Sequence, residues 1–113
     1  MEEIRVKHIL QKHTLSRNPH DSYRDKPITR SKEEAIENIE KIRDAIINDG
    51  KSFADIASEI SECRSAANGG DLGFFGRGMM QKEFEDAAFA LSVGEISGLV
   101  DSDSGIHIIL REE

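Results

Sequence analysis

Residues 103–110 read DSGIHIIL, a turn that contains a glycine followed by a strand that carries His107 between isoleucines. Alternation of this kind is typical of a strand with a buried face. A second histidine strand is predicted over residues 4–12, where His8 shares one face with apolar side chains. If the two strands are neighbours in a sheet, the imidazoles can hydrogen-bond each other and fix both tautomers. One histidine on an apolar face is usually a core residue, and a second one weakens that interpretation.

The segments between the two histidine strands predict a single α+β domain over residues 1–113 with a small, mostly antiparallel sheet. Ser31 and Glu34 have the spacing of a capping box, and the apolar stripe of the helix that follows ends at Gly50. The other predicted elements are a helix capped by Ser52, a turn at 61–65, a short extended piece at 71–75, a helix from about Phe84 that is ended by Val93-Gly94, and a hairpin of strands at 96–101 and 106–111.

Composition excludes several classes of site. One cysteine among 113 residues permits no intramolecular disulfide, which fits a reducing compartment. The four histidines show none of the spacings of a metal motif, so neither a metal nor an organic cofactor is expected. No apolar run approaches the roughly 18 residues of a membrane span, and the first residues have no apolar region of a signal peptide. We therefore expect no contact with membranes.

Charge is unevenly distributed along the chain. The net charge is −7, yet residues 1–30 hold seven Lys and Arg against four Asp and Glu. An acidic body argues against binding of nucleic acid, whereas a local basic patch favours a small anionic group. Residues 13–30 hold both prolines and no periodicity, which predicts a long loop, and long loops are usually functional or disordered. An ordinary solvated charge distribution explains the charges equally well.

A few side chains outside the histidine strands are candidates for a site. Cys63 follows a helix in a polar turn, where partial exposure is expected although a free cysteine is usually a small buried apolar residue. A set of Leu, Met and Phe side chains is normally core, but Met80 and Gln81 precede the helix stripe that contains Phe84. Apolar residues at the entry of a helix can face a cleft. Lys12 is in register with His8 and should emerge at the edge of the same surface.

Together these residues resemble the parvulin family of peptidyl-prolyl cis/trans isomerases, and most closely the members that act on phospho-Ser/Thr-Pro bonds. The resemblance covers essentially the whole chain and implies a four-stranded sheet surrounded by about four helices. Because the chain has no Trp, it resembles a single-domain form without the Trp-containing WW module. The segments that carry the resemblance are VKHILQKH (6–13), SRNP (16–19), ITRSKEEA (28–35), FADIASEISEC (53–63), GDLG (70–73), MQK (80–82), FEDA (84–87) and DSGIHII (103–109).

The resemblance implies a role for each matched residue. The implied catalytic residues are His8, Cys63, Ser104 and His107; the implied proline pocket consists of Leu72, Met80, Gln81, Phe84 and Ser102; the implied phosphate clamp consists of Lys12 and Arg17. Three positions depart from the family pattern: Asn18 stands where a second clamp arginine is common, and Arg64 and Glu83 replace a small residue and a proline. The implied partners are phosphorylated Ser/Thr-Pro proteins, bound by a monomer in the cytoplasm, the nucleus or both.

Three alternatives remain open from the residues themselves. The first is a cysteine hydrolase that uses Cys63 with a histidine base, although no oxyanion-hole motif accompanies it. The second is a phosphopeptide-binding module that uses the same clamp without turnover. The third is a parvulin that ignores phosphate, which Lys12 and Arg17 argue against and Asn18 leaves open.

Overall fold

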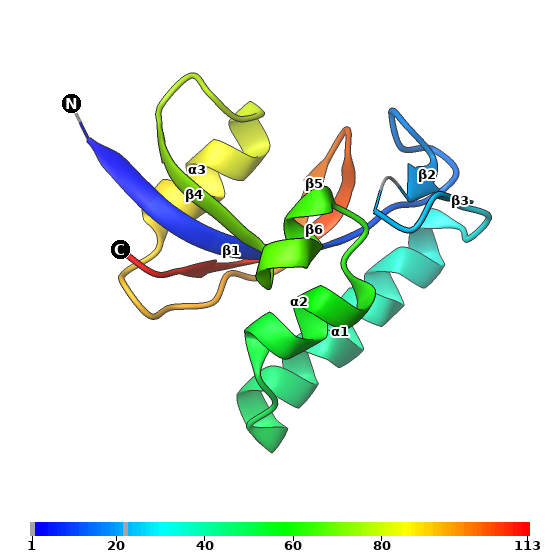
Figure 1. Cartoon of the computed structure of the whole chain (residues 1–113), viewed down its shortest axis with the longest axis horizontal. Coiled ribbons are helices and arrows are strands. Elements are labelled where there is room, and N and C mark those ends of the chain that lie inside the picture. Colours follow the sequence, from blue (N-terminus) through cyan, green and yellow to red (C-terminus); the bar gives the residue numbers. More distant parts are fainter. Residues whose placement is uncertain (1, 22) are drawn as a thin grey trace.

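A four-stranded antiparallel sheet forms the centre of the computed structural model, which describes residues 2–21 and 23–113 (Figure 1). In the order in which they pair, the strands are β4 (Asp71–Gly76), β1 (Glu3–Gln11), β6 (Gly105–Arg111) and β5 (Val100–Ser102). The first and last strands of the chain are therefore neighbours, with His8 opposite Ile109 and Leu10 opposite His107. This register places the two histidines diagonally on one face of the sheet.

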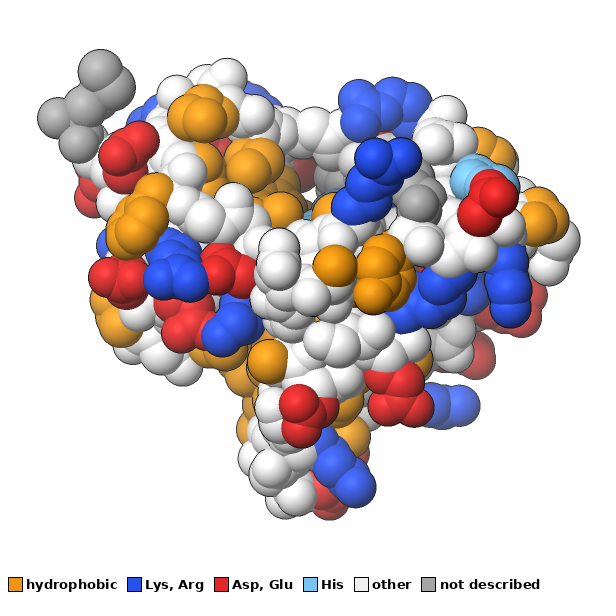
Figure 2. Space-filling view, viewed as in Figure 1, with side chains coloured by type: hydrophobic (Ala, Val, Ile, Leu, Met, Phe, Trp, Pro, Cys, Tyr) orange, Lys and Arg blue, Asp and Glu red, His pale blue; other side chains and the backbone are white. Residues whose placement is uncertain are grey.

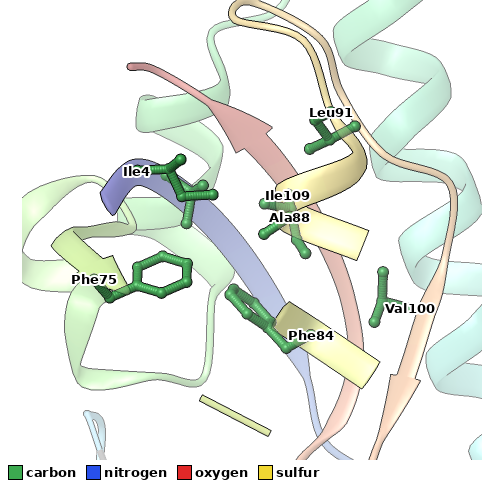
Figure 3. Packing of buried hydrophobic residues seen from close by; sticks show 8 residues of the cluster. Ile4, Phe75, Phe84, Ala88, Leu91, Val100 and Ile109 are labelled. Atoms are coloured by element: carbon green, nitrogen blue, oxygen red, sulfur yellow. The ribbon is translucent and has the colours of Figure 1, made fainter. Parts of the chain in front are cut away.

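Helices cover both faces of the sheet (Figure 1). They are α1 (Lys32–Asp49), α2 (Phe53–Ile60), the 3-10 helix η1 (Arg64–Asn68) and α3 (Lys82–Ala90). One core cluster joins Ile9, Ile106 and Ile108 of the sheet to α1 and α2. The other joins the opposite face of the sheet to α3, with Phe84 and Ala88 directed at the strands (Figure 3). None of the described helices is long and apolar enough to cross a membrane.

The local signals for the first two helices are confirmed. Ser31 and Glu34 form both hydrogen bonds of the capping box, and Gly50 ends α1 in the left-handed conformation with φ 69°. The Ser52 side chain accepts a hydrogen bond from the backbone of Asp55 at the start of α2. These side chains satisfy backbone groups that a helix end leaves without partners. The predicted α+β class and small antiparallel sheet are confirmed with them.

Several boundaries differ from the prediction. Residues 13–30 contain a short hairpin, β2 (His20–Asp21) and β3 (Lys26–Pro27), whose two-residue strands are too short for any periodicity to reveal. The predicted strand at 96–101 is shorter, because the Ser97 hydroxyl rather than a backbone carbonyl accepts from the N–H of Ile109. The predicted turn at 61–65 leads into η1, which begins at Arg64, and α3 ends at Ala90 instead of at Val93-Gly94.

Candidate active site

The two sheet histidines are in direct contact. Their Nδ1 atoms lie 3.1 Å apart, which confirms the expected contact between the imidazoles. On the far side of each ring, His8 Nε2 lies 3.2 Å from Ser65 Oγ and His107 Nε2 lies 2.7 Å from Ser102 Oγ. Four side chains thus form one continuous hydrogen-bonded row. Each neutral imidazole can donate at one nitrogen and accept at the other, so the row fixes both rings without any charge.

Burial keeps both imidazoles neutral. Each histidine is 4% exposed. Burial lowers the pKa of His8 to about 4; it also lowers the pKa of His107 well below its ordinary value, and the nearby His8 adds to this shift. The edge of each ring packs against Phe84, with centroid separations of 5.4 and 5.2 Å. Near neutral pH the pair is therefore an uncharged support for the floor of a pocket.

An apolar pocket opens above the histidine pair. Its volume is about 370 Å³, and Leu72, Met79, Met80 and Phe84 supply its apolar walls. Leu72 comes from β4, the two methionines from the link between β4 and α3, and Phe84 from the first turn of α3. The polar lining includes Gln81, Ser104, Cys63 and both histidines. A pocket of this size that is walled by apolar side chains and has a few polar groups can hold a ring such as that of proline.

A second pocket of about 330 Å³ adjoins the first and shares Arg17, Cys63 and Ser104 with it. Its other lining residues include Lys12, Asn18, Glu62 and Arg64. In Figure 2, a hollow in the upper part of the molecule has hydrophobic side chains on one side and Lys and Arg side chains on the other. A ligand that spans both pockets therefore meets an apolar surface at one end and cations at the other.

Glu62 ties the cationic pocket to Cys63. Its carboxylate is buried and accepts hydrogen bonds from the backbone N–H of Lys12 at 2.7 Å and from the guanidinium of Arg30 at 2.6 Å. Its own N–H donates to the carbonyl of Leu10 at 2.9 Å. The residue before Cys63 thereby holds the end of β1, from which Lys12 extends. Nothing in the sequence pattern pointed to Glu62, because its partners are about 30 and 50 residues away along the chain.

Glu62→Gln should destabilise the protein by about 2 kcal/mol, because the guanidinium of Arg30 loses its buried counter-ion. The free energy of unfolding from urea titration measures the effect. Glu59→Gln is the matched control, since Glu59 is exposed on α2 and it is its backbone carbonyl, which the substitution retains, that accepts from Arg24. Equal free energies of unfolding for the two variants would show that the Glu62 contacts contribute nothing to stability.

The structure brings almost all of the predicted site residues into the two pockets. Ser102 differs: it is 7% exposed, and its hydroxyl is directed at His107, so it supports an imidazole from below. Ser104 contacts Gln81 through its hydroxyl at 3.4 Å. The sequence interpretation missed Ser65, Met79 and Glu62. No cluster of three or more His, Cys, Asp or Glu side chains suited to a metal ion occurs within residues 2–21 and 23–113.

Comparison with known proteins identifies the family. The family model described as "PPIC-type PPIASE domain" matches residues 8–113. Among curated proteins, the chain is 52% identical over 111 residues to "Putative peptidyl-prolyl cis-trans isomerase dodo" of Drosophila melanogaster, covering 98% of this chain and 66% of the fly protein. It is 48% identical over 114 residues to "Peptidyl-prolyl cis-trans isomerase Pin1" of Digitalis lanata, covering 97% and 96%.

The solved structures agree with these matches. The structure of "Peptidyl-prolyl isomerase ESS1 from Candida albicans" superimposes with a TM-score of 0.94 at 39% identity, covering 98% of this chain and 63% of that one. The chain thus spans less than two thirds of the Drosophila and Candida proteins and nearly all of the Digitalis protein. With a family model that matches all but its first seven residues, the chain belongs to the PPIC-type, or parvulin, family of peptidyl-prolyl cis/trans isomerases.

Proposed function

We propose that this domain catalyses cis/trans isomerisation of prolyl bonds in protein substrates and prefers bonds that follow phosphoserine or phosphothreonine. The observation that carries the proposal is the junction of the two pockets at Arg17, Cys63 and Ser104. In a phospho-Ser-Pro segment, a dianionic group and an apolar ring flank a single peptide bond. An apolar pocket that adjoins a cationic one has the chemistry to bind both at once.

The reaction needs no bond to break. Rotation about a peptide bond has a barrier of about 18–20 kcal/mol, and uncatalysed prolyl isomerisation takes tens to hundreds of seconds. An enzyme accelerates it by binding the twisted amide more tightly than the planar one. Twisting removes the resonance of the amide, so the carbonyl loses partial negative charge and the nitrogen gains basicity. A weakly polar pocket around the ring disfavours the more polar planar form.

The chain's residues divide this work between them. Leu72, Met80 and Phe84 hold the proline ring, while Arg17 binds the phosphate on the other side of the rotating bond. The ammonium of Lys12 lines the same cationic pocket and donates to the carbonyl of His20 at 2.5 Å, which also ties the substrate loop to β1. The histidine pair organises the floor of the site, and Cys63 faces the twisting amide without having to act as a nucleophile.

Exchange rates of three matched peptides test the proposal. NMR exchange spectroscopy should give a kcat/KM at least tenfold higher for a phospho-Ser-Pro peptide than for a Ser-Pro peptide, with a Glu-Pro peptide between them. Lys12→Ala/Arg17→Ala should lower this preference. Since Lys12 is buried, the single variant Arg17→Ala provides a second test that leaves the core intact.

Other results of this peptide comparison would indicate a different function for the domain. Equal acceleration of the three peptides would make the domain a phosphate-independent isomerase. Tight binding of the phosphopeptide without acceleration would leave only a recognition module. Lys51→Ala is the matched control, because Lys51 is exposed in the link between α1 and α2 and carries the same charge. It should leave the preference for the phosphopeptide unchanged.

A further inference from the structure

We propose that Arg64 is a further phosphate-binding residue, which supplies the cation that position 18 lacks in this chain. The inference rests on the proposed function, because it assigns a specificity-determining residue to the same site. In the sequence, Arg64 is the residue directly after Cys63 and the first residue of η1. In the structure, it lines the cationic pocket together with Lys12 and Arg17, so three segments of the chain each contribute one cation.

Most other cations near this pocket already have protein partners. The guanidinium of Arg24 binds carbonyls at the end of α2, including that of Ser61 at 2.7 Å. Arg30 binds Glu62, and the ammonium of Lys12 binds the carbonyl of His20. These contacts use hydrogen bonds that a phosphate would otherwise receive. Most hydrogen bonds to a substrate phosphate must therefore be donated by other side chains that line the pocket.

Arg64 and Arg17 meet that requirement. Both residues are exposed, and within residues 2–21 and 23–113 neither guanidinium has a hydrogen bond or an ion pair. Each therefore offers a full set of N–H donors in a planar arrangement that matches two phosphate oxygens. Asn18 lines the same pocket with a neutral amide, which adds no charge toward the dianion.

The acidic side chain in the pocket does not cancel this positive field. Glu62 is the only carboxylate in the described lining, and its charge is compensated by the ion pair with Arg30 at 2.6 Å. Lys12, Arg17 and Arg64 therefore leave net positive charge in this pocket, and Arg17 lies where it meets the apolar pocket, with Cys63 and Ser104. A phosphate on the residue before proline would lie within this field.

The test is the phosphate preference of Arg64→Ala, expressed as the ratio of kcat/KM for a phospho-Ser-Pro peptide to that for the matched Ser-Pro peptide. Loss of one charge-assisted contact should lower this ratio about tenfold. Lys51→Ala removes a charge far from both pockets and should leave the ratio at the wild-type value. A wild-type protein without any phosphate preference would overturn the proposed function, whereas a preference that survives in Arg64→Ala would overturn this inference alone.

Two further variants separate phosphate binding from an effect through the neighbouring cysteine. In a Cys63→Ala background, Arg64→Ala should still weaken the Kd of the phosphopeptide about tenfold in calorimetry; an unchanged Kd would show that Arg64 acts only through Cys63. Adding Asn18→Arg to Arg64→Ala should restore the phosphate preference. If it does not, position 18 cannot reach the phosphate that Arg64 binds, and the compensation between the two positions is wrong.

Discussion

Gly70→Ala should cost about 3–4 kcal/mol of folding free energy, because it combines backbone strain with a steric clash. Gly70 has φ +87°, a conformation that residues with a Cβ rarely adopt. A Cβ at this position would lie 2.5 Å from the carbonyl oxygen of His8 and 3.0 Å from the Cβ of Ala57. The backbone cannot move away easily, because the carbonyl of Gly70 accepts a hydrogen bond from the N–H of His8 at 3.0 Å.

Gly50→Ala is the control that separates the two effects. Gly50 has φ +69°, yet a Cβ there would meet no atom within 4 Å. It should therefore show strain alone, at about 1 kcal/mol. Urea unfolding of both variants measures the difference. If the two substitutions lower the free energy of unfolding equally, the close approach of Gly70 to β1 has no energetic consequence. The backbone at Gly70 would then be able to move away from His8.

The fold was predictable wherever a local signal coincided with a tertiary contact. The capping box at Ser31 and the glycine at the end of α1 depend on side chains within one turn, so the sequence alone locates them. The alternation that leads to His8 reflects burial of one face of β1, and periodicity detects it, whereas β6 is buried on both faces around His107. Strands of two residues, such as β2 and β3, are too short for a repeating pattern of buried side chains. Their hairpin is stabilised by the carboxylate of Asp21, which accepts from the backbone N–H groups of Tyr23 and Arg24.

The site was only partly predictable, for a related reason. Leu72 and Phe84 line a pocket directly, and the resemblance to the parvulin motifs identified both. The residues that the sequence interpretation missed include common polar residues with distant partners: Glu62 contacts Arg30, and Ser65 contacts His8 across 57 positions. These contacts form only when the segment that joins α2 to η1 packs against the end of β1 and the loop that follows it. Side chains that act on a substrate are therefore easier to identify from a sequence than the residues that orient them.

Acidification from pH 7 to about 4.5 should destabilise the native protein through the histidine pair. The pKa of His8 is about 4 in the folded chain and near 6.5 in the unfolded one. Between these values the unfolded state binds more protons, so the free energy of unfolding falls as the pH falls. The stabilisation that comes from neutral His8 is fully present above about pH 6.5, and about 2–3 kcal/mol of it is lost by pH 4.5. His107, whose pKa burial also lowers, adds to the loss in the same direction.

Replacing both histidines should remove most of this dependence. His8→Asn/His107→Asn keeps polar side chains in the row between Ser65 and Ser102 but removes the titrating groups. Urea unfolding of wild type and the double variant at several pH values between 4.5 and 7 gives the comparison. A small slope should persist from His13, whose pKa burial and Lys32 also lower. If the free energy of unfolding of the double variant depends on pH as steeply as that of the wild type, other groups control acid stability. The neutral histidine pair would then not be the source of the acid sensitivity.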